Sequence, residues 1–196
     1  MTQIRDGTGT GARARVDNQN RLAASAVTAT RELDATEEGE AYQIVSGRLT
    51  LTSANPSAVL YVRNLSQIAF VLDRVVFIWG SSTGGAGNDL GFQTQRNPDG
   101  GTIISTATTA GISNSNHASA KTPDATAYAG TEGATLTGGT GVTLPLKDTG
   151  GRQVFPLRRV LGTGSSIGWV VTPPSGNTSL DVVVVAHFYY DQTGEI

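Results

Sequence analysis

Apolar and polar residues alternate along several short segments of the chain, which is the pattern of β-strands with one buried face. In residues 48–52 the two leucines fall on one side and the polar residues on the other. A turn at 54–57 leads into a second apolar segment at 58–64. Residues 68–80 form a longer run, rich in β-branched and aromatic side chains and bounded by glycine and serine. The pattern therefore predicts strands from about residue 42 onward.

Asp73 and Arg74 interrupt the longest of these segments. Neighbouring residues on a strand face opposite sides of the sheet. We therefore expect these two charged side chains not to pair with each other.

The last third of the chain predicts three more strands, at 151–161, 167–172 and 179–191, separated by the turn sequences GTGSS and PPSGNT. Alternate residues of the last strand are uniformly apolar or aromatic: Val182, Val184, Ala186, Phe188 and Tyr190. The opposite face, with Asp181, Val183, Val185, His187 and Tyr189, is also mostly apolar. A strand of this kind belongs in the middle of a sandwich or barrel, or against another subunit.

The middle of the chain has a different composition. Residues 106–141 are rich in Ala, Ser, Thr, Gly and Asn, and few residues there could anchor a core; Leu136 and, just before the span, Ile103 and Ile104 are the exceptions. Long connections of this kind tend to be functional or ordered by a partner. We expect loops that pack on a neighbouring subunit.

Short strands, many turn residues and no helical period together predict an all-β fold. The expected architecture is an antiparallel β-sandwich or a jelly-roll-like barrel with long loops. The predicted organisation is an extended N-terminal arm at residues 1–41, followed by a single β domain at residues 42–196.

The arm has three early glycines, Gly7, Gly9 and Gly11, and no apolar period that could form a core. It contains five arginines, which are our candidate partner-binding residues: Arg5, Arg13, Arg15, Arg21 and Arg31. With Asp6 and Asp17 the local charge of residues 1–31 is 5 − 2 = +3. The acidic sequence ELDATEEGE follows, and it is typical of a solvated turn or a short helix.

Charge is sparse and unevenly distributed. Lys and Arg number 14 against 16 Asp and Glu, so the whole chain predicts neither nucleic-acid nor anionic-membrane binding. Charged residues make up only 15% of the chain, compared with about 25% in average domains, which favours a surface that a partner covers. Lys121 and Lys147 are the only lysines; the arginine excess fits a protein interface or, equally, a GC-rich genome.

Catalytic and cofactor signatures are missing. The chain has no cysteine, and its histidines, His117 and His187, show no metal-ligand spacing, so we expect no catalytic residue, metal or cofactor. GTGTG at 7–11 and GTGSSIG at 162–168 lack the spacing of nucleotide-binding loops. The start has no apolar signal region and no run long enough to span a membrane, so we expect synthesis in a cytosol without a cleaved export signal.

Several sequence strings resemble virion structural proteins of tailed bacteriophages, in particular head decoration (cement) proteins. They are IRDGTGTGARARVDNQNRLAASAVT and EEGEAYQIVSGRLTLTSANPSAVLYVRN in the first third, EGATLTGGTGV at 132–142, and LGTGSSIGWVVTPPSGNTSLDVVVV at 161–185. The resemblance covers most of the chain and brings no catalytic residues with it.

The resemblance implies a decoration protein on the head exterior that bridges neighbouring major capsid proteins and stabilises the shell. A homotrimer on a three-fold or quasi-three-fold position would be the expected form. The arm would lie across a neighbour, with its glycines allowing close backbone contact and its arginines meeting an acidic groove. We expect no nucleic-acid or membrane partner.

Two alternatives use the same features. A tail, baseplate or fibre-adaptor protein would join a ring or rod through the same arm and β domain. A carbohydrate-binding adhesin would need Trp79, Trp169, Tyr189 and Tyr190 to form an exposed stacking platform.

Overall fold

A computed structural model describes residues 3–5, 13–16, 22–23, 31–84, 89–106 and 108–191, and the chain divides into two compact units, Met1–Thr30 and Arg31–Ile196. In the first unit, β1 (Gln3–Arg5), β2 (Arg13–Val16) and β3 (Leu22–Ala23) form a small antiparallel sheet in that order. Arg5 lies opposite Arg13 in this sheet. The arginine-rich segment thus contains local strand pairing of its own.

The second unit begins with the short helix α1 (Arg31–Glu37). Its buried Ala35 faces the rest of the unit, and the helix contacts β4 and β15. The acidic sequence that predicted a solvated turn or short helix is this helix. Its packing on the sheet explains why it belongs to the second unit.

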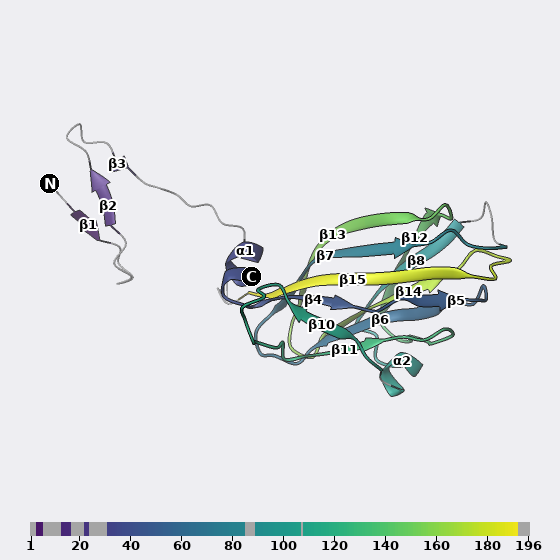
Figure 1. Ribbon diagram of the computed structural model, residues 1–196. Coiled ribbons are helices and arrows are strands. Elements are labelled where there is room, and N and C mark those ends of the chain that lie inside the picture. Colours follow the sequence, from purple (N-terminus) through teal and green to yellow (C-terminus); the bar gives the residue numbers. More distant parts are fainter. Residues whose placement is uncertain are drawn as a thin grey trace. The chain divides into compact units, whose positions relative to one another are not determined.

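Two antiparallel sheets form a sandwich in the second unit (Figure 1). The first sheet has the order β10 (Gly111–Asn114), β4 (Ala41–Val45), β15 (Leu180–Tyr190), β7 (Phe70–Trp79), β13 (Gly151–Leu161), with β5 (Leu49–Leu51) also paired to β15. The second has the order β12 (Thr140–Lys147), β8 (Asp89–Arg96), β14 (Ser166–Thr172), β6 (Ser57–Asn64), β11 (Ala125–Ala129), β9 (Thr108–Thr109).

The strand pairing identifies the sandwich as a jelly roll. The innermost pair is β8 with β12; β7 with β13, β6 with β14 and β4 with β15 enclose it in succession. These four nested antiparallel pairs are distributed alternately between the two sheets, which is the wrapping of a jelly roll. The all-β sandwich predicted from the sequence is confirmed, and of the two architectures expected it is the jelly-roll form.

The core fills the space between the sheets. Its largest fully buried side chains include Trp169, Phe70, Phe77 and Phe92, and the rings of Phe77 and Phe92 stack with centroids 4.4 Å apart. On β15 burial alternates along the whole strand. The central position predicted for this strand is confirmed: it lies between β4 and β7.

The middle of the chain packs on its own sandwich. Between β8 and β12 the chain forms α2 (Thr102–Ser105), β9, β10 and β11, and these strands extend both sheets. Ile103, Ala110, Ala127 and Ala134 are buried there. The expectation of loops packed on a neighbouring subunit is therefore corrected for these residues, because small side chains allow the backbone to pair closely with the sheet edges.

The expectation for Asp73 and Arg74 was also wrong, since a guanidinium nitrogen of Arg74 donates to the Asp73 carboxylate at 2.8 Å. His187 pairs with Arg74 and Phe188 with Leu72, which leaves Asp73 as an extra residue in β7. A bulge of this kind breaks the alternation of side chains. The two charged groups therefore reach the same side of the sheet.

Candidate functional site

The described residues hold no recognisable catalytic group. His187 is half-buried on the outer face of β15, where burial first, and the positive charge of Arg74 second, lower its pKa. His117 lies in the segment after β10. In the described ranges no three His, Asp or Glu side chains are placed to hold a metal. The helices within those ranges lack the length and apolar character needed to cross a membrane.

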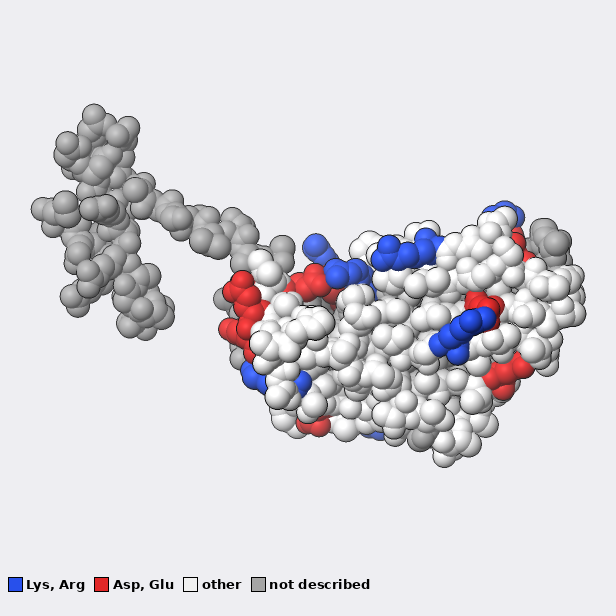
Figure 2. All heavy atoms as spheres, in the orientation of Figure 1, with Lys and Arg blue, Asp and Glu red and all other residues white. Residues whose placement is uncertain are grey.

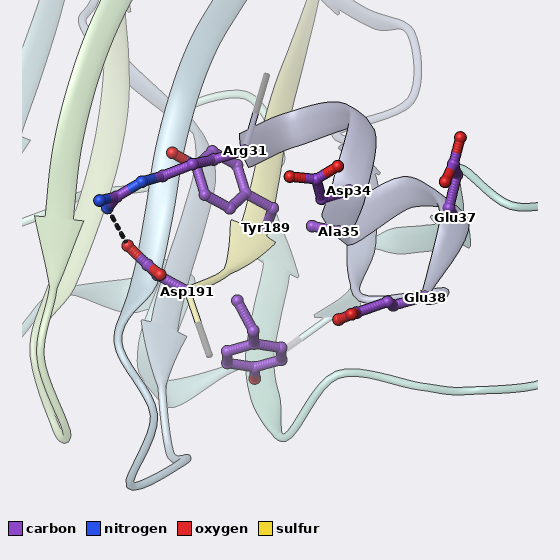
Figure 3. A pocket seen from close by; sticks show the side chains of 8 residues that line it. Arg31, Asp34, Ala35, Glu37, Glu38, Tyr189 and Asp191 are labelled. Carbon is purple, nitrogen blue, oxygen red and sulfur yellow. Dashed lines mark hydrogen bonds and ion pairs between the residues drawn. The ribbon is translucent and has the colours of Figure 1, made fainter. Parts of the chain in front are cut away.

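A pocket of about 330 Å³ lies between α1 and the end of β15 (Figure 3). Arg31 reaches across it, and a guanidinium nitrogen lies 2.7 Å from the carboxylate of Asp191, which is buried. Asp34 and Glu37 of α1 and Glu38 just after it also line the pocket, as do Tyr189 and Tyr190. The carboxylates outnumber the single guanidinium, so this pocket would favour a cation or a basic side chain.

The tyrosines of this pocket offer no base. Burial raises the pKa of Tyr189, and it raises the pKa of Tyr190 far more strongly. Both hydroxyls stay protonated near neutral pH as a result. The pocket therefore holds charge and shape for recognition, without an activated nucleophile.

The second candidate surface is the side of the sandwich where β12 and β13 form the outer strands, which we call the open flank (Figure 1). Large apolar side chains are exposed there: Val142 (53%), Leu144 (40%), Val154 (38%) and Val160 (47%). Single exposed apolar residues are ordinary, but these four leave large apolar side chains exposed on both edge strands, where a partner protein would contact them.

Charge is sparse over much of the sandwich in one view (Figure 2). In the first sheet, outward residues of β4 and β15 such as Gln43, Val45, Val183 and Val185 are uncharged and only partly buried. If a partner covers this sparsely charged surface, the residues that it would contact are those of the open flank and of the outer face of the first sheet.

The five candidate arginines are distributed between the two units. Arg31 begins α1 and contacts Asp191. The backbones of Arg5, Arg13 and Arg15 lie in β1 and β2, and their side chains are outside the description, whereas Arg21 lies outside the described residues altogether. The contacts that would bind a partner through this segment remain a prediction.

The aromatic platform required for an adhesin is not formed. Trp169 is fully buried at 0% exposure, and Tyr190 is buried at 6%. Trp79 packs against Phe77 and donates its indole N–H to the Lys147 carbonyl. These four aromatic residues support the core and its margin and provide no common exposed surface for a sugar ring.

Sequence comparison finds no matching family and no matching curated protein. Among solved structures, a chain from deformed wing virus is 9% identical, covers 87% of this chain and 89% of its own, and has a TM-score of 0.29. The infectious bursal disease virus VP2 subviral particle is 9% identical, with 77% and 41% covered and a TM-score of 0.24. Particles derived from infectious bursal virus are 10% identical, with 78% and 40% covered and a TM-score of 0.18. Likenesses of this size carry no functional argument, and the fold assignment rests on the strand pairing above.

Proposed function

We propose that this chain is a structural protein of a virion, and specifically a decoration protein that binds the outer surface of an assembled phage head. In this role it bridges neighbouring major capsid proteins and stabilises the shell. The bacteriophage resemblance of the sequence motivates the proposal, and the open flank is the structural observation that carries it.

The open flank supports this role because it offers apolar contact area on two edge strands. Both strands contain a proline, Pro145 in β12 and Pro156 in β13, which cannot donate a backbone hydrogen bond to an added strand. A partner would therefore be held mainly by side chains such as Val142 and Val154, rather than by uncontrolled strand addition.

The N-terminal segment supplies the second contact. Residues Met1–Thr30 form a compact unit of their own. This unit contains Arg5, Arg13, Arg15 and Arg21, and Arg31 follows it directly in the sequence. We propose that it docks in an acidic groove of a neighbouring capsid subunit, and that the decorating form is a homotrimer on the head exterior. Each copy binds the assembled shell better than free subunits, so many copies stabilise the head by mass action.

Copy number tests the role directly. Quantitative mass spectrometry of purified virions should give a ratio of this chain to the major capsid protein near one to one. A ratio far below that would assign the chain to a tail, baseplate or fibre adaptor instead. Absence of the chain from purified virions would contradict both versions.

Binding to undecorated heads tests the surface. Val142→Asp together with Val154→Asp should abolish co-sedimentation with heads, while Leu65→Asp should leave it intact. Leu65 is a suitable control because it is similarly exposed, at 44%, and lies just after β6 instead of on the open flank. Equal binding by both variants would remove the open flank from the proposal.

A further inference from the structure

A second pocket of about 330 Å³ lies where β13 leaves the first sheet and the chain crosses to β14. Three arginines line it: Arg96 at the end of β8, and Arg158 and Arg159 near the end of β13. Ser165 and Ser166 line it from the start of β14. Figure 2 shows Lys and Arg side chains gathered along the edge of the sandwich where β7 and β13 run in Figure 1.

These three arginines differ from four other basic residues of the sandwich, whereas Arg63 and Arg152 also have no carboxylate within ion-pair distance among the described residues. Arg48, Arg74, Lys121 and Lys147 each lie within ion-pair distance of a carboxylate. No carboxylate pairs with Arg96, Arg158 or Arg159 anywhere in the part of the chain that the structure describes. Three cations around one pocket repel each other unless an anion compensates them.

Arg159 shows the imbalance most clearly. Its Nε is buried and has no hydrogen-bond acceptor among the described residues. Burial lowers the pKa of this guanidinium, and the nearby charge of Arg96 lowers it further. A buried donor on a charged group without an acceptor is costly, which makes it a marker for a missing ligand.

The backbone around the pocket is also unusual. Asn97 has φ of 48° and Arg158 has φ of 42°, and they are the only non-glycine residues with positive φ in the described ranges. Both line this pocket. The register of β13 shifts between Pro156 and Arg159, so a bulge lies directly beside the pocket. Strained backbone of this kind gathers at ligand sites.

We infer that this pocket is an oxyanion-binding site, which holds a phosphate or carboxylate group between the guanidinium groups of Arg96 and Arg159, with Arg158 also lining the pocket. Guanidinium groups bind both anions through paired, charge-assisted hydrogen bonds. The Ser165 hydroxyl lies at the same pocket and is available as a further donor. The inference does not depend on the virion proposal, because it rests on the pocket alone.

Two sources supply this chemistry. One is inorganic phosphate in solution. The other is an acidic side chain of a second copy of this chain. The exposed Glu37 and Glu38, at the C-terminal end of α1, are candidates for this side chain. A contact between the arginine pocket of one copy and α1 of the next would be head to tail, which closes into a ring where the geometry permits.

Phosphate titration of the full chain, followed by backbone amide NMR at constant ionic strength, tests the site. Saturable shifts are expected at Asn97, Ser165 and Ser166, with chloride as the inactive comparison. Arg96→Gln should weaken binding about tenfold, since it removes charge-assisted hydrogen bonds. Arg152→Gln is the matched control, because Arg152 is exposed on β13 and lies outside the pocket.

Sedimentation velocity at low salt distinguishes the sources. Concentration-dependent association that phosphate, Arg96→Gln and Glu37→Gln/Glu38→Gln each reduce would identify the ligand as a carboxylate of a second copy. Saturable phosphate binding by a chain that stays monomeric would identify a free anion. The inference is overturned if phosphate produces no saturable shifts and Arg96→Gln changes association no more than Arg152→Gln does.

Discussion

The two flanks of the sandwich differ in whether further strands of the chain cover their edges. On one flank, the segment between β8 and β12 pairs β11 with β6 and β10 with β4, and β9 joins β10 across the single buried residue Ala110. On the open flank, β12 and β13 are the last strands of their sheets within the described residues. One flank is thus closed by the chain itself.

The difference shows how a jelly roll separates stability from recognition. The closed flank buries small residues and backbone hydrogen bonds, for example the Ala110 N–H to the Ala127 carbonyl at 3.0 Å. The open flank keeps valines and unpaired arginines accessible and restrains strand addition with prolines. We therefore expect substitutions on the closed flank to act on folding, and substitutions on the open flank to act on binding.

The largest contrast should come from placing the same carboxylate on each flank. Ala110→Asp puts a charge among buried apolar side chains, and we expect unfolding to become easier by about 4 kcal/mol or more. Val154→Asp, at a position 38% exposed, should cost no more than about 1 kcal/mol. Urea denaturation measures both. Similar losses for the two variants would show that the flanks do not differ in this way.

Truncation of an apolar side chain should also destabilise the fold more on the closed flank than on the open flank, but the difference in stability should be smaller. Ile103 of α2 is 2% exposed and packs against Ala58, Tyr61 and Val170, so Ile103→Ala should cost about 3 kcal/mol. Val160→Ala, at a position 47% exposed, should change stability by about 0.5 kcal/mol or less. Melting temperatures in parallel with urea curves check both values. An unchanged Ile103→Ala variant would mean that α2 is dispensable for the fold.

A modest pH effect is expected from His187, which faces Arg74 and Asp73 of β7, Glu32 of α1 and Arg152 of β13. Its folded pKa lies below the unfolded value of 6.5, so the unfolded chain takes up the proton first as the pH falls. The stabilisation is therefore complete above pH 6.5 and is lost as the pH falls toward the folded pKa.

Denaturation curves between pH 8 and pH 5.5 measure this effect above the range in which carboxylates titrate. We expect the wild-type chain to lose stability across this interval and His187→Gln to show a flatter dependence. A steeper dependence in the variant would contradict the assignment to His187.

Much of the sandwich could be predicted from residue pattern. The strands expected at 58–64, 151–161 and 167–172 lie within a residue of β6, β13 and β14. Their signal is strong because apolar and β-branched side chains are continuous there and turns bound them. The position of β15 at the middle of its sheet followed from its two apolar faces.

The strands between residues 89 and 147 could not be predicted in the same way. β11 buries only Ala127 fully and lacks large apolar residues at alternate positions, whereas β12 has Val142, Leu144 and Leu146 at alternate positions but is exposed along most of its length. Their pairing is determined by the neighbouring edges of β8 and β6. Information of this kind lies in the tertiary structure and is absent from the local sequence.

The arginine pocket was missed for a related reason. Arg158 and Arg159 are adjacent in the sequence, where alternation predicts opposite faces, and Arg96 is more than sixty residues earlier. The end of β13 and the pairing of Arg96 with Ile167 of β14 bring the three residues to one pocket. Reasoning from a two-residue period failed at Asp73 and Arg74, where β7 contains a bulge.

The smallest expected effect on stability concerns the edge itself. Pro145 of β12 is exposed and lies opposite Gly91 of β8. Pro145→Val should therefore change the free energy of unfolding by about 0.5 kcal/mol or less. The variant does, however, gain a backbone N–H on an edge strand, which permits pairing with another chain. We expect concentration-dependent association to increase in sedimentation velocity, with Thr143→Val as the control that keeps its N–H. If Pro145→Val associates no more than Thr143→Val, the proline does not guard this edge, and the open flank is protected by its twist and side chains alone.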